Sequence, residues 1–339
     1  MILFFGEMAT VNYGKISGMK SIIIETNTAK IEIIPERGGN IRSLFHKPTN
    51  RHVLWRNREL DVRKPTGDEK DYKPFNSGGW DECFPTIAPT VYYGRSIRGI
   101  PLPDHGELWN ANWDAEVLDL NDDKKSVLMR MHGRALPYSF ERTITLFDRD
   151  EKTSHLTLGY RVTNEANEDM NFLWAAQPLF EAEKGYIIDL PEVSQVTVVQ
   201  SFNLNLGPKG SKIGWPVHKD VSGSLLELNK FGWLPNTAYK VFAKINHGLC
   251  RVIDNTGTHY VEMHFDENPV PFVGVWMNQG LDMFGLGGQE REGEERMGHI
   301  SVQPSSGMPD SLEEARNFGT YKKIPAKSTI HWSLDCIIT

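Results

Sequence analysis

Cysteine is scarce in this chain, and the few cysteines present do not form a motif. Cys83, Cys250 and Cys336 are widely spaced, odd in number and include no Cys-x-x-Cys pair. This usage argues against a disulfide framework and fits a reducing compartment. We therefore expect a cytoplasmic protein.

Long apolar runs and an excess of positive charge are also missing. No stretch approaches the roughly 20 apolar residues that span a bilayer, and the first residues lack the pattern of a signal peptide. The 37 Lys and Arg against 44 Asp and Glu give a net charge of −7. We therefore expect neither nucleic acid nor a membrane as partner. The sequence does not reveal the oligomeric state.

Extended helical periodicity is nearly absent, and alternation of apolar and polar side chains dominates instead. Residues 138–146 and 155–163 alternate strictly around a polar connection at 148–153, which predicts two half-buried strands joined as a hairpin. The one expected helix begins at Asp310 or Ser311 and stops at Gly319. Similar strand patterns recur at 21–25, 30–34, 41–46, 115–120, 125–131, 239–245, 258–265, 271–276, 299–303 and 328–338.

Many strands and few helices predict an all-β fold, a large antiparallel β-sandwich with few short helices. No linker or internal repeat is evident, so we expect a single domain over residues 1–339, with 1–20 as an N-terminal extension. Two polar segments, 61–79 and 285–298, are expected to be long loops. Such loops often carry function on β scaffolds.

The first stretch whose residues could bind or transform a ligand places Trp80, Asp81 and Glu82 directly after two glycines. A Trp ring can cover the apolar face of a pyranose, and carboxylates accept hydrogen bonds from sugar hydroxyls. This combination suits sugar binding. The alternative is a loop with surface acids and an anchoring Trp. Cys83, which follows, has no adjacent base and is expected to be a small buried side chain.

The second stretch contains His105, which lies between Asp104 and Gly106, with Glu107 next. A histidine in this setting is a candidate acid, base or hydrogen-bonding group. A single histidine is also commonly structural or solvated, so both alternatives stay open here.

The third and fourth stretches put amides in apolar strands. Gln177 lies within the run 172–180, and Gln303 ends a strand before a proline. Trp276 and Asn278 end another predicted strand. A buried amide needs hydrogen-bond partners, so these positions are either satisfied core residues or ligand contacts at strand ends.

Together, in this order and in an all-β context, these stretches resemble the aldose 1-epimerase, or galactose mutarotase-like, superfamily. The resemblance runs from about residue 21 to residue 335 and includes a strand–Gly-Gly–strand signature at 34–44. It implies a β-supersandwich with an open cleft that binds a small-molecule sugar, without a cofactor or metal. The expected substrate-binding residues are Trp80, Asp81, Glu82, Glu107, Trp276 and Asn278.

The resemblance also implies a mechanism in which a glutamate and a histidine transfer protons and a second histidine assists near the ring oxygen. His105 matches the assisting histidine. Gln177 and Gln303 occupy the places of the acid histidine and the basic glutamate. A carboxamide does not take up a proton near neutral pH. The resemblance therefore implies His105, Gln177 and Gln303 as the catalytic positions, with an altered acid/base set.

Other side chains are candidates for metal binding, phosphate binding or hydrolysis. Glu262 and His264 lie two apart on a predicted strand, a spacing that suits either a metal or, as we expect, a polar strand face. Arg95 and Arg98 would suit a phosphorylated sugar. The adjacent carboxylates Asp81 and Glu82 would point opposite ways in a strand, which makes them a poor flanking pair for glycoside hydrolysis.

Two functions therefore remain open at the level of sequence. The first is an epimerase that interconverts the anomers of an aldose with rearranged acid/base groups. The second is a sugar-binding or sensing protein that kept the cleft and lost catalysis.

Overall fold

Two large antiparallel sheets form the protein in this computed structural model, which describes residues 9–58, 60–121, 123–282 and 298–339. The twelve-stranded sheet runs in the order β1 (Thr10–Ile16), β2 (Met19–Glu25), β3 (Ala29–Ile34), β4 (Asn40–His46), β6 (Trp80–Cys83), β14 (Ala175–Glu181), β24 (His299–Ser305), β23 (Phe272–Asn278), β20 (Ala238–Lys244), β16 (Gln195–Phe202) and β17 (Lys212–Gly214), with β5 (Arg51–His52) paired to β4.

The second sheet has eight strands. Its order is β15 (Ile187–Asp189), β21 (Leu249–Ile253), β22 (Tyr260–Phe265), β26 (Thr329–Ile338), β12 (Ser154–Asn164), β11 (Tyr138–Asp148), β10 (Lys124–His132) and β9 (Asp114–Asn121). Three small pairs complete the strands: β7 (Thr90–Tyr93) with β8 (Arg98–Leu102), β13 (Met170–Phe172) with β25 (Lys322–Ile324), and β18 (Val217–Lys219) with β19 (Leu225–Glu227).

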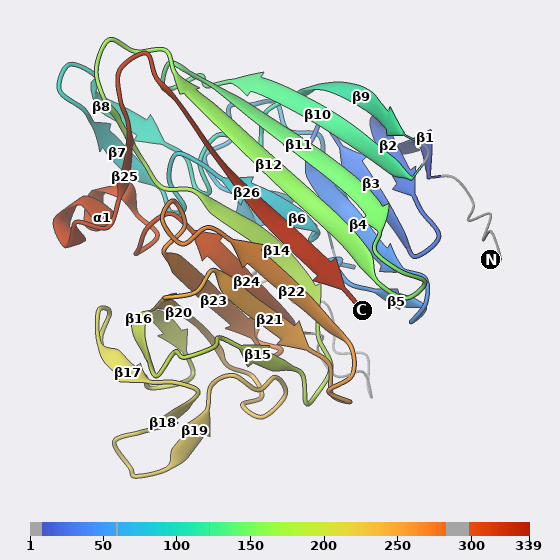
Figure 1. The fold of residues 1–339 in the computed structure, drawn as a ribbon. Helices are drawn as coiled ribbons and strands as arrows, with labels where there is room; N and C mark the ends of the chain where they lie inside the picture. The colour runs from blue at the N-terminus through green and yellow to red at the C-terminus, as the bar shows by residue number, and fades with distance from the viewer. Residues whose placement is uncertain (1–8, 59, 122, 283–297) are drawn as a thin grey trace.

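The two large sheets pack face to face. In Figure 1 the blue strands β2 to β4 lie behind the green strands β10 to β12. The main core fills the space between them, with Ile31 and Val275 from one sheet and Phe140 and Leu158 from the other. Burial of such apolar surface on both inner faces is what stabilises a β-sandwich.

The alternating patterns give the strands that they predict. Burial along β11 and β12 alternates at nearly every residue, and the polar connection between them turns the chain between Asp148 and Ser154. The expected all-β fold with few short helices is confirmed. The helices described are the one-turn 3-10 helix η1 (Lys73–Phe75) and α1 (Leu312–Phe318).

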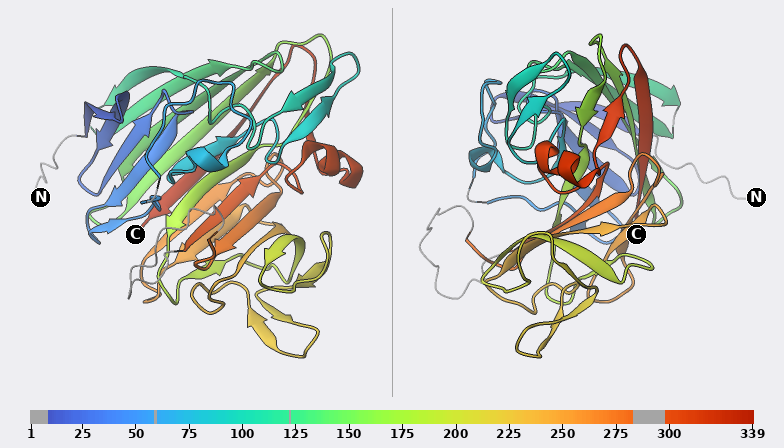
Figure 2. Two further views of the ribbon diagram at one scale, coloured as in Figure 1. Left: turned by 180° about the vertical axis from the view of Figure 1, so that it is seen from behind. Right: turned by 90° about the vertical axis from the view of Figure 1, so that its left-hand side faces the viewer.

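Helix α1 has the ends that its sequence predicts. Ser311 is the N-cap, and Gly319 ends the helix in the left-handed conformation, with φ of 68°. Figures 1 and 2 both place α1 beside the β7–β8 hairpin, where Arg316 donates a hydrogen bond of 2.8 Å to the Tyr93 carbonyl. The helix therefore closes one end of the molecule and fixes the segment 306–311 that precedes it.

The structure describes the expected loop at 61–79 and part of the expected N-terminal extension. Residues 61–79 are a long irregular segment that contains only η1. The expected loop 285–298 lies outside the described residues except for Gly298. Within the expected extension 1–20, residues 10–16 form the edge strand β1. The single-domain reading stays a prediction. No helix in the described part of the chain has the length and apolar character to cross a membrane.

Candidate functional site

Three of the four sequence stretches singled out for their chemistry meet on neighbouring strands of the large sheet. Strands β6, β14, β24, β23 and β20 are consecutive in its order. They carry residues 80–83, 175–181, 299–305, 272–278 and 238–244, which lie far apart along the chain. Pairing in the sheet therefore assembles one surface from segments that the sequence shows separately.

Alternation divides these strands into two faces. Trp80 belongs to the main core between the sheets, whereas its neighbour Cys83 belongs to a separate apolar cluster on the opposite face. We call this opposite face the outer face. Its apolar cluster consists of Cys83, Ile87, Ala175, Val199, Phe242, Phe272 and Met308.

Gln177 and Gln303 lie side by side on the outer face. The pairs Ala175–Ser305 and Leu179–Ser301 set the register of β14 and β24, which places the two glutamines opposite each other. The Cys83 thiol donates to Gln177 Oε1 at 3.1 Å, and Gln303 Nε2 donates to Ser301 Oγ at 3.1 Å. Both glutamine side chains are buried.

A missing side chain makes room for this arrangement. Gly274 pairs with Gln303 across β23 and β24. A Cβ at Gly274 would lie 3.1 Å from Gln303 Oε1 and 3.0 Å from the Phe242 ring. We call Cys83, Gln177, Gly274 and Gln303 the amide floor. Gln303 Oε1 is buried without a hydrogen-bond partner in the described part of the chain, and a buried oxygen of this kind requires a hydrogen-bond donor.

His105 lies on a loop beside the amide floor and has a positive φ of 62°. Its ring stacks on Tyr72 with centroids 4.0 Å apart, and its Nδ1 lies 3.0 Å from Asp104 Oδ1. Its backbone N–H donates to the carbonyl of Ile87, a member of the outer apolar cluster. Burial opposes ionisation of Asp104, but the His105 charge and hydrogen bonds hold the pKa of that carboxyl below its ordinary value.

Lys240 and Asp310 form an ion pair at the same place, which the sequence patterns did not reveal. Their Nζ and Oδ1 atoms are 2.6 Å apart, and the side chains are only 7% and 14% exposed. Lys240 Nζ lies over the Phe242 ring, 5.3 Å from its centroid. Lys240 stands in a strand pattern without any motif, so no local signal could have identified it.

Trp80 and Glu82 point away from the outer face. Both are fully buried between the sheets. Glu82 accepts hydrogen bonds from Arg142 at 3.1 Å, Tyr160 at 2.9 Å and the Trp174 indole at 2.9 Å. Burial raises the pKa of Glu82 to about 7 despite the opposing charge of Arg142. Neither side chain presents a surface to a ligand, so the structure does not bring them to the amide floor.

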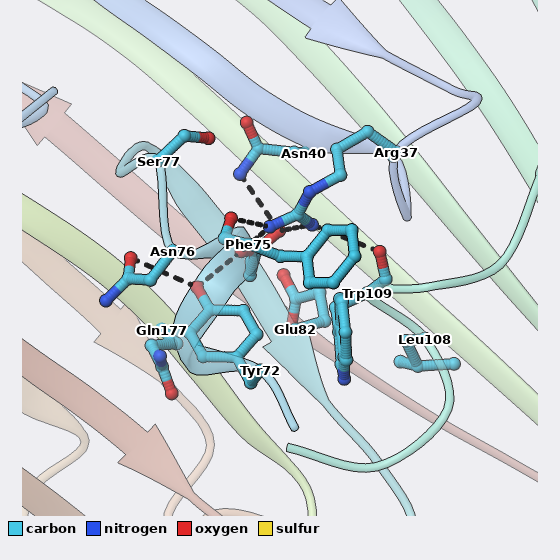
Figure 3. Close-up of polar contacts among 12 residues, drawn as sticks. Arg37, Asn40, Tyr72, Phe75, Asn76, Ser77, Glu82, Leu108, Trp109 and Gln177 are labelled. Atoms are coloured by element: carbon cyan, nitrogen blue, oxygen red, sulfur yellow. Dashed lines mark hydrogen bonds and ion pairs between the residues drawn. The ribbon is translucent and has the colours of Figure 1, made fainter. Parts of the chain in front are cut away.

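Asp81 is on the outer side but is fully engaged. Arg37 contacts its two oxygens at 3.2 and 3.3 Å, Asn40 donates to it at 2.9 Å, and the Tyr72 hydroxyl donates at 2.7 Å. Figure 3 shows Arg37, Asn40 and Tyr72 converging on one point, with Gln177 to the side. Asp81 thus anchors the segment around Tyr72, on which His105 stacks.

Glu107 is also committed to hydrogen bonds that stabilise the fold. Its carboxylate accepts hydrogen bonds from the backbone N–H groups of Arg134 and Ala135, at 3.1 and 2.7 Å, and from the Tyr138 hydroxyl at 3.2 Å. The side chain is 2% exposed. It fastens the turn before β11 and lies apart from the amide floor.

Trp276 and Asn278 lie at one end of β23. The half-buried Trp276 donates its indole N–H to His299 Nε2 at 3.1 Å, and the His299 ring stacks on Trp55 at 4.3 Å. Burial lowers the pKa of His299 to about 4, so this ring is a neutral acceptor. Asn278 holds the turn at Leu281 through two backbone hydrogen bonds of 2.9 and 3.1 Å.

The remaining candidates do not form a second site. Glu262 contacts His264 and Arg251 on the polar face of β22. No group of three or more metal-ligating side chains occurs in the described ranges. Burial raises the pKa of the Cys83 thiol well above its ordinary value, which disfavours the nucleophilic thiolate. Arg95 and Arg98 lie exposed on the β7–β8 hairpin.

A hollow elsewhere in the molecule contains none of the expected site residues. It lies near β5 and the end of β26, and some of its polar groups are paired. Arg51 contacts Asp254 at 2.6 Å, and His46 bonds to the Thr49 hydroxyl and the Lys152 carbonyl. The amide floor, rather than this hollow, contains Gln177 and Gln303, two of the residues that the sequence singled out.

Comparison with solved structures identifies the architecture. A galactose mutarotase-like protein from Clostridium acetobutylicum aligns over 97% of this chain and 98% of its own, with a TM-score of 0.66 and 15% identity. The chain has the galactose mutarotase-like fold. A galactose mutarotase related enzyme from Lactobacillus acidophilus gives a TM-score of 0.59 at 16% identity, over 94% of this chain and 97% of its own.

One similar structure belongs to a longer protein. A TPR-domain containing protein from Parabacteroides distasonis aligns over 95% of this chain with a TM-score of 0.65 and 14% identity. The chain spans about half the length of that protein, 47% of it. No family model matches the sequence, and no curated protein matches it significantly.

Proposed function

We propose that this chain binds an aldose or a related sugar on the outer face and interconverts its anomers by general acid–base catalysis. The proposal rests above all on one observation: Gln177 and Gln303 lie opposite each other on neighbouring strands, with His105 held beside them. These are the three positions that the resemblance assigns to proton transfer and its assistance. The fold, shared with mutarotase-like proteins, supports the same class of ligand.

The polar groups at the amide floor suit hydroxyl recognition. A sugar hydroxyl can donate to the unpartnered Gln303 Oε1 and accept from an amide N–H. Trp276 is half-buried and stands two residues after Gly274 on β23, beside the floor. Trp80, Glu82, Asp81 and Glu107 then serve as structural supports rather than sugar ligands. A cytoplasmic location stays a prediction.

The contacts of His105 suit an assisting role in the proposed reaction. Asp104 Oδ1 lies 3.0 Å from one ring nitrogen, and stacking on Tyr72 fixes the plane of the ring. A ring oriented in this way can form a hydrogen bond near the sugar ring oxygen through its other nitrogen. His105 thus assists, while the two amides position the sugar without transferring protons.

The test combines binding and turnover. Calorimetric titration with a panel of aldoses should identify a sugar that binds, and exchange NMR should then show faster anomer exchange with catalytic amounts of protein. His105→Asn should lower that rate by about 100-fold, while a control, His132→Asn on an exposed strand, leaves it unchanged. An unchanged rate in His105→Asn would contradict the assisting role.

A second function, sugar binding without catalysis, is favoured by one specific observation. Gln177 already accepts a hydrogen bond from Cys83, and Gln303 donates to Ser301, so the floor is a set of fixed hydrogen-bonding groups. Heat of binding for a sugar together with no acceleration of anomer exchange would select this function.

A further inference from the structure

The proposed reaction needs one group that accepts a proton from the anomeric hydroxyl and one that donates a proton to the ring oxygen. Neither amide can do this. The carboxylates nearest in sequence are committed elsewhere: Asp81 to Arg37, Glu82 to Arg142, and Glu107 to backbone N–H groups. These three carboxylates are therefore poor candidates for the missing base.

Lys240 and Asp310 lie against the amide floor. Gln303 Oε1 and the Phe242 ring both border the space above Gly274, and Lys240 Nζ sits over that same ring. The charges of both Lys240 and Asp310 act on the pKa of the Cys83 thiol, in opposite senses. The ion pair therefore lies on the outer face beside the Phe242 ring, which borders Gly274 of the amide floor.

The carboxylate of Asp310 is held but not saturated. The backbone carbonyl of Asp310 accepts hydrogen bonds from Ile87 and Ala88, at 3.0 and 2.8 Å, which fixes the residue against the outer apolar cluster. Its Oδ1 is close to Lys240 Nζ, yet it is a buried oxygen without an aligned hydrogen-bond donor in the described part of the chain. Ile87 also accepts from the His105 backbone, so Asp310 and His105 flank the same residue.

We infer that Asp310 and Lys240 are the base and acid of the reaction and replace the side chains absent at Gln303 and Gln177. This inference rests on the proposed anomeric interconversion. Asp310 takes the proton of the anomeric hydroxyl as the C1=O1 double bond forms. The C1–O5 bond breaks, its electron pair goes to O5, and O5 receives a proton from the Lys240 ammonium.

The reverse steps restore both groups. After rotation about C1–C2, the O5 hydroxyl attacks C1 from the other face and returns its proton to the Lys240 amine. The Asp310 carboxylic acid returns its proton to O1. During the open-chain stage the pair is neutral, and burial disfavours separated charges relative to neutral groups.

Conservative variants separate this role from a structural one. Lys240→Arg keeps a positive charge for Asp310, but a guanidinium does not release its proton in proteins. Asp310→Asn keeps the shape and cannot act as a base. Each should lower the anomer exchange rate by about 100-fold or more, with sugar affinity by calorimetry unchanged within threefold. Lys244→Met, an exposed lysine on the same strand, is the control.

The outcomes are distinct. Loss of exchange in both variants, with binding and thermal unfolding retained, supports the inference. Wild-type exchange that persists in Lys240→Arg and Asp310→Asn overturns the acid–base pair and leaves the epimerase proposal standing. Absence of exchange in the wild-type protein overturns the proposed function and this pair together. If Lys240→Arg fails to fold, Asp310→Asn alone decides.

Discussion

The two faces of the large sheet, at strands β6 and β14, use polar residues in opposite ways. On the inner side Glu82 is fully buried with Arg142, Tyr160 and Trp174 around it. On the outer side Gln177 and Gln303 have few partners, and one amide oxygen has none in the described ranges. Glu82 on the inner face stabilises the fold, and so does Asp81 on the outer side, whereas the amide floor keeps an amide oxygen without a partner in the described ranges.

This difference explains why charge near a tryptophan is a poor guide to chemistry here. Paired and fully hydrogen-bonded carboxylates, such as Asp81 and Glu82, are structural, although the sequence indicates them as candidate sugar ligands. The uncharged Gln177 and Gln303, for which the sequence leaves a core role open, lie where the proposed ligand binds. The comparison predicts that stability and ligand affinity respond to different sets of substitutions.

The largest expected effect is on the inner face. Arg142→Met leaves the Glu82 carboxylate buried without its cation and should lower the free energy of unfolding by about 3–5 kcal/mol. Urea denaturation measures this. The loss should shrink at acid pH, because burial raises the pKa of Glu82 and protonation removes the uncompensated charge.

Arg130→Met on β10 is the matched control. Its ion pair with Glu116 is exposed, so the expected loss is below about 1 kcal/mol. Equal losses at Arg142 and Arg130 would show that the buried pair does not hold the inner face.

The next effect concerns His299, a neutral group near the outer face. Its pKa falls from 6.5 to about 4 on folding, so the unfolded chain binds the proton first. Its contribution to stability is complete above pH 6.5 and is lost as pH falls to about 4, by about 3 kcal/mol. His299→Gln should flatten this acid limb of a stability–pH curve. An equally steep limb in the variant would contradict the assignment.

A smaller effect on stability but a large effect on binding is expected at the amide floor. Gln177→Ala and Gln303→Ala each remove one hydrogen bond and should cost about 1 kcal/mol of unfolding free energy. Sugar affinity should fall about tenfold or more, equivalent to about 1.4 kcal/mol. Calorimetry and urea denaturation on the same variants measure both quantities. A large loss of stability with unchanged affinity would reverse the roles of the two faces.

The smallest effect is expected at Gly274. In Gly274→Ala the new Cβ meets Gln303 Oε1 and Phe242 at 3.1 and 3.0 Å, so these side chains must shift by a few tenths of an ångström. Sugar affinity should fall severalfold with little change in stability. Gly159→Ala in β12, where the nearest atom is 3.8 Å away, is the control. Equal affinities in both variants would remove Gly274 from the floor.

The fold was largely predictable from sequence because its signals are local. Strict alternation over 138–146 sets the two faces of β11, and Ser311 with Gly319 sets the ends of α1. The sequence indicated the proposed site only where a motif resembled a family, as at Gln177, Gln303 and His105, and these assignments stay predictions. Trp80 and Glu82 were expected to bind sugar, but alternation alone does not tell which face of β6 a second sheet will cover.

The ion pair on the outer face shows the same limit. Lys240 lies in a strand pattern like many others, and Asp310 reads as a helix-start residue. They meet only because β20 and the segment before α1 adjoin in the folded chain. A contact between residues so distant in sequence leaves no signature in either segment.

The most direct test of the account is two-dimensional exchange NMR on a panel of aldoses, with and without catalytic amounts of the wild-type protein. If the protein catalyses anomer exchange at the amide floor, anomer cross-peaks of at least one sugar grow faster with the protein present. No acceleration for any aldose would contradict catalysis at the amide floor and leave sugar binding as its function.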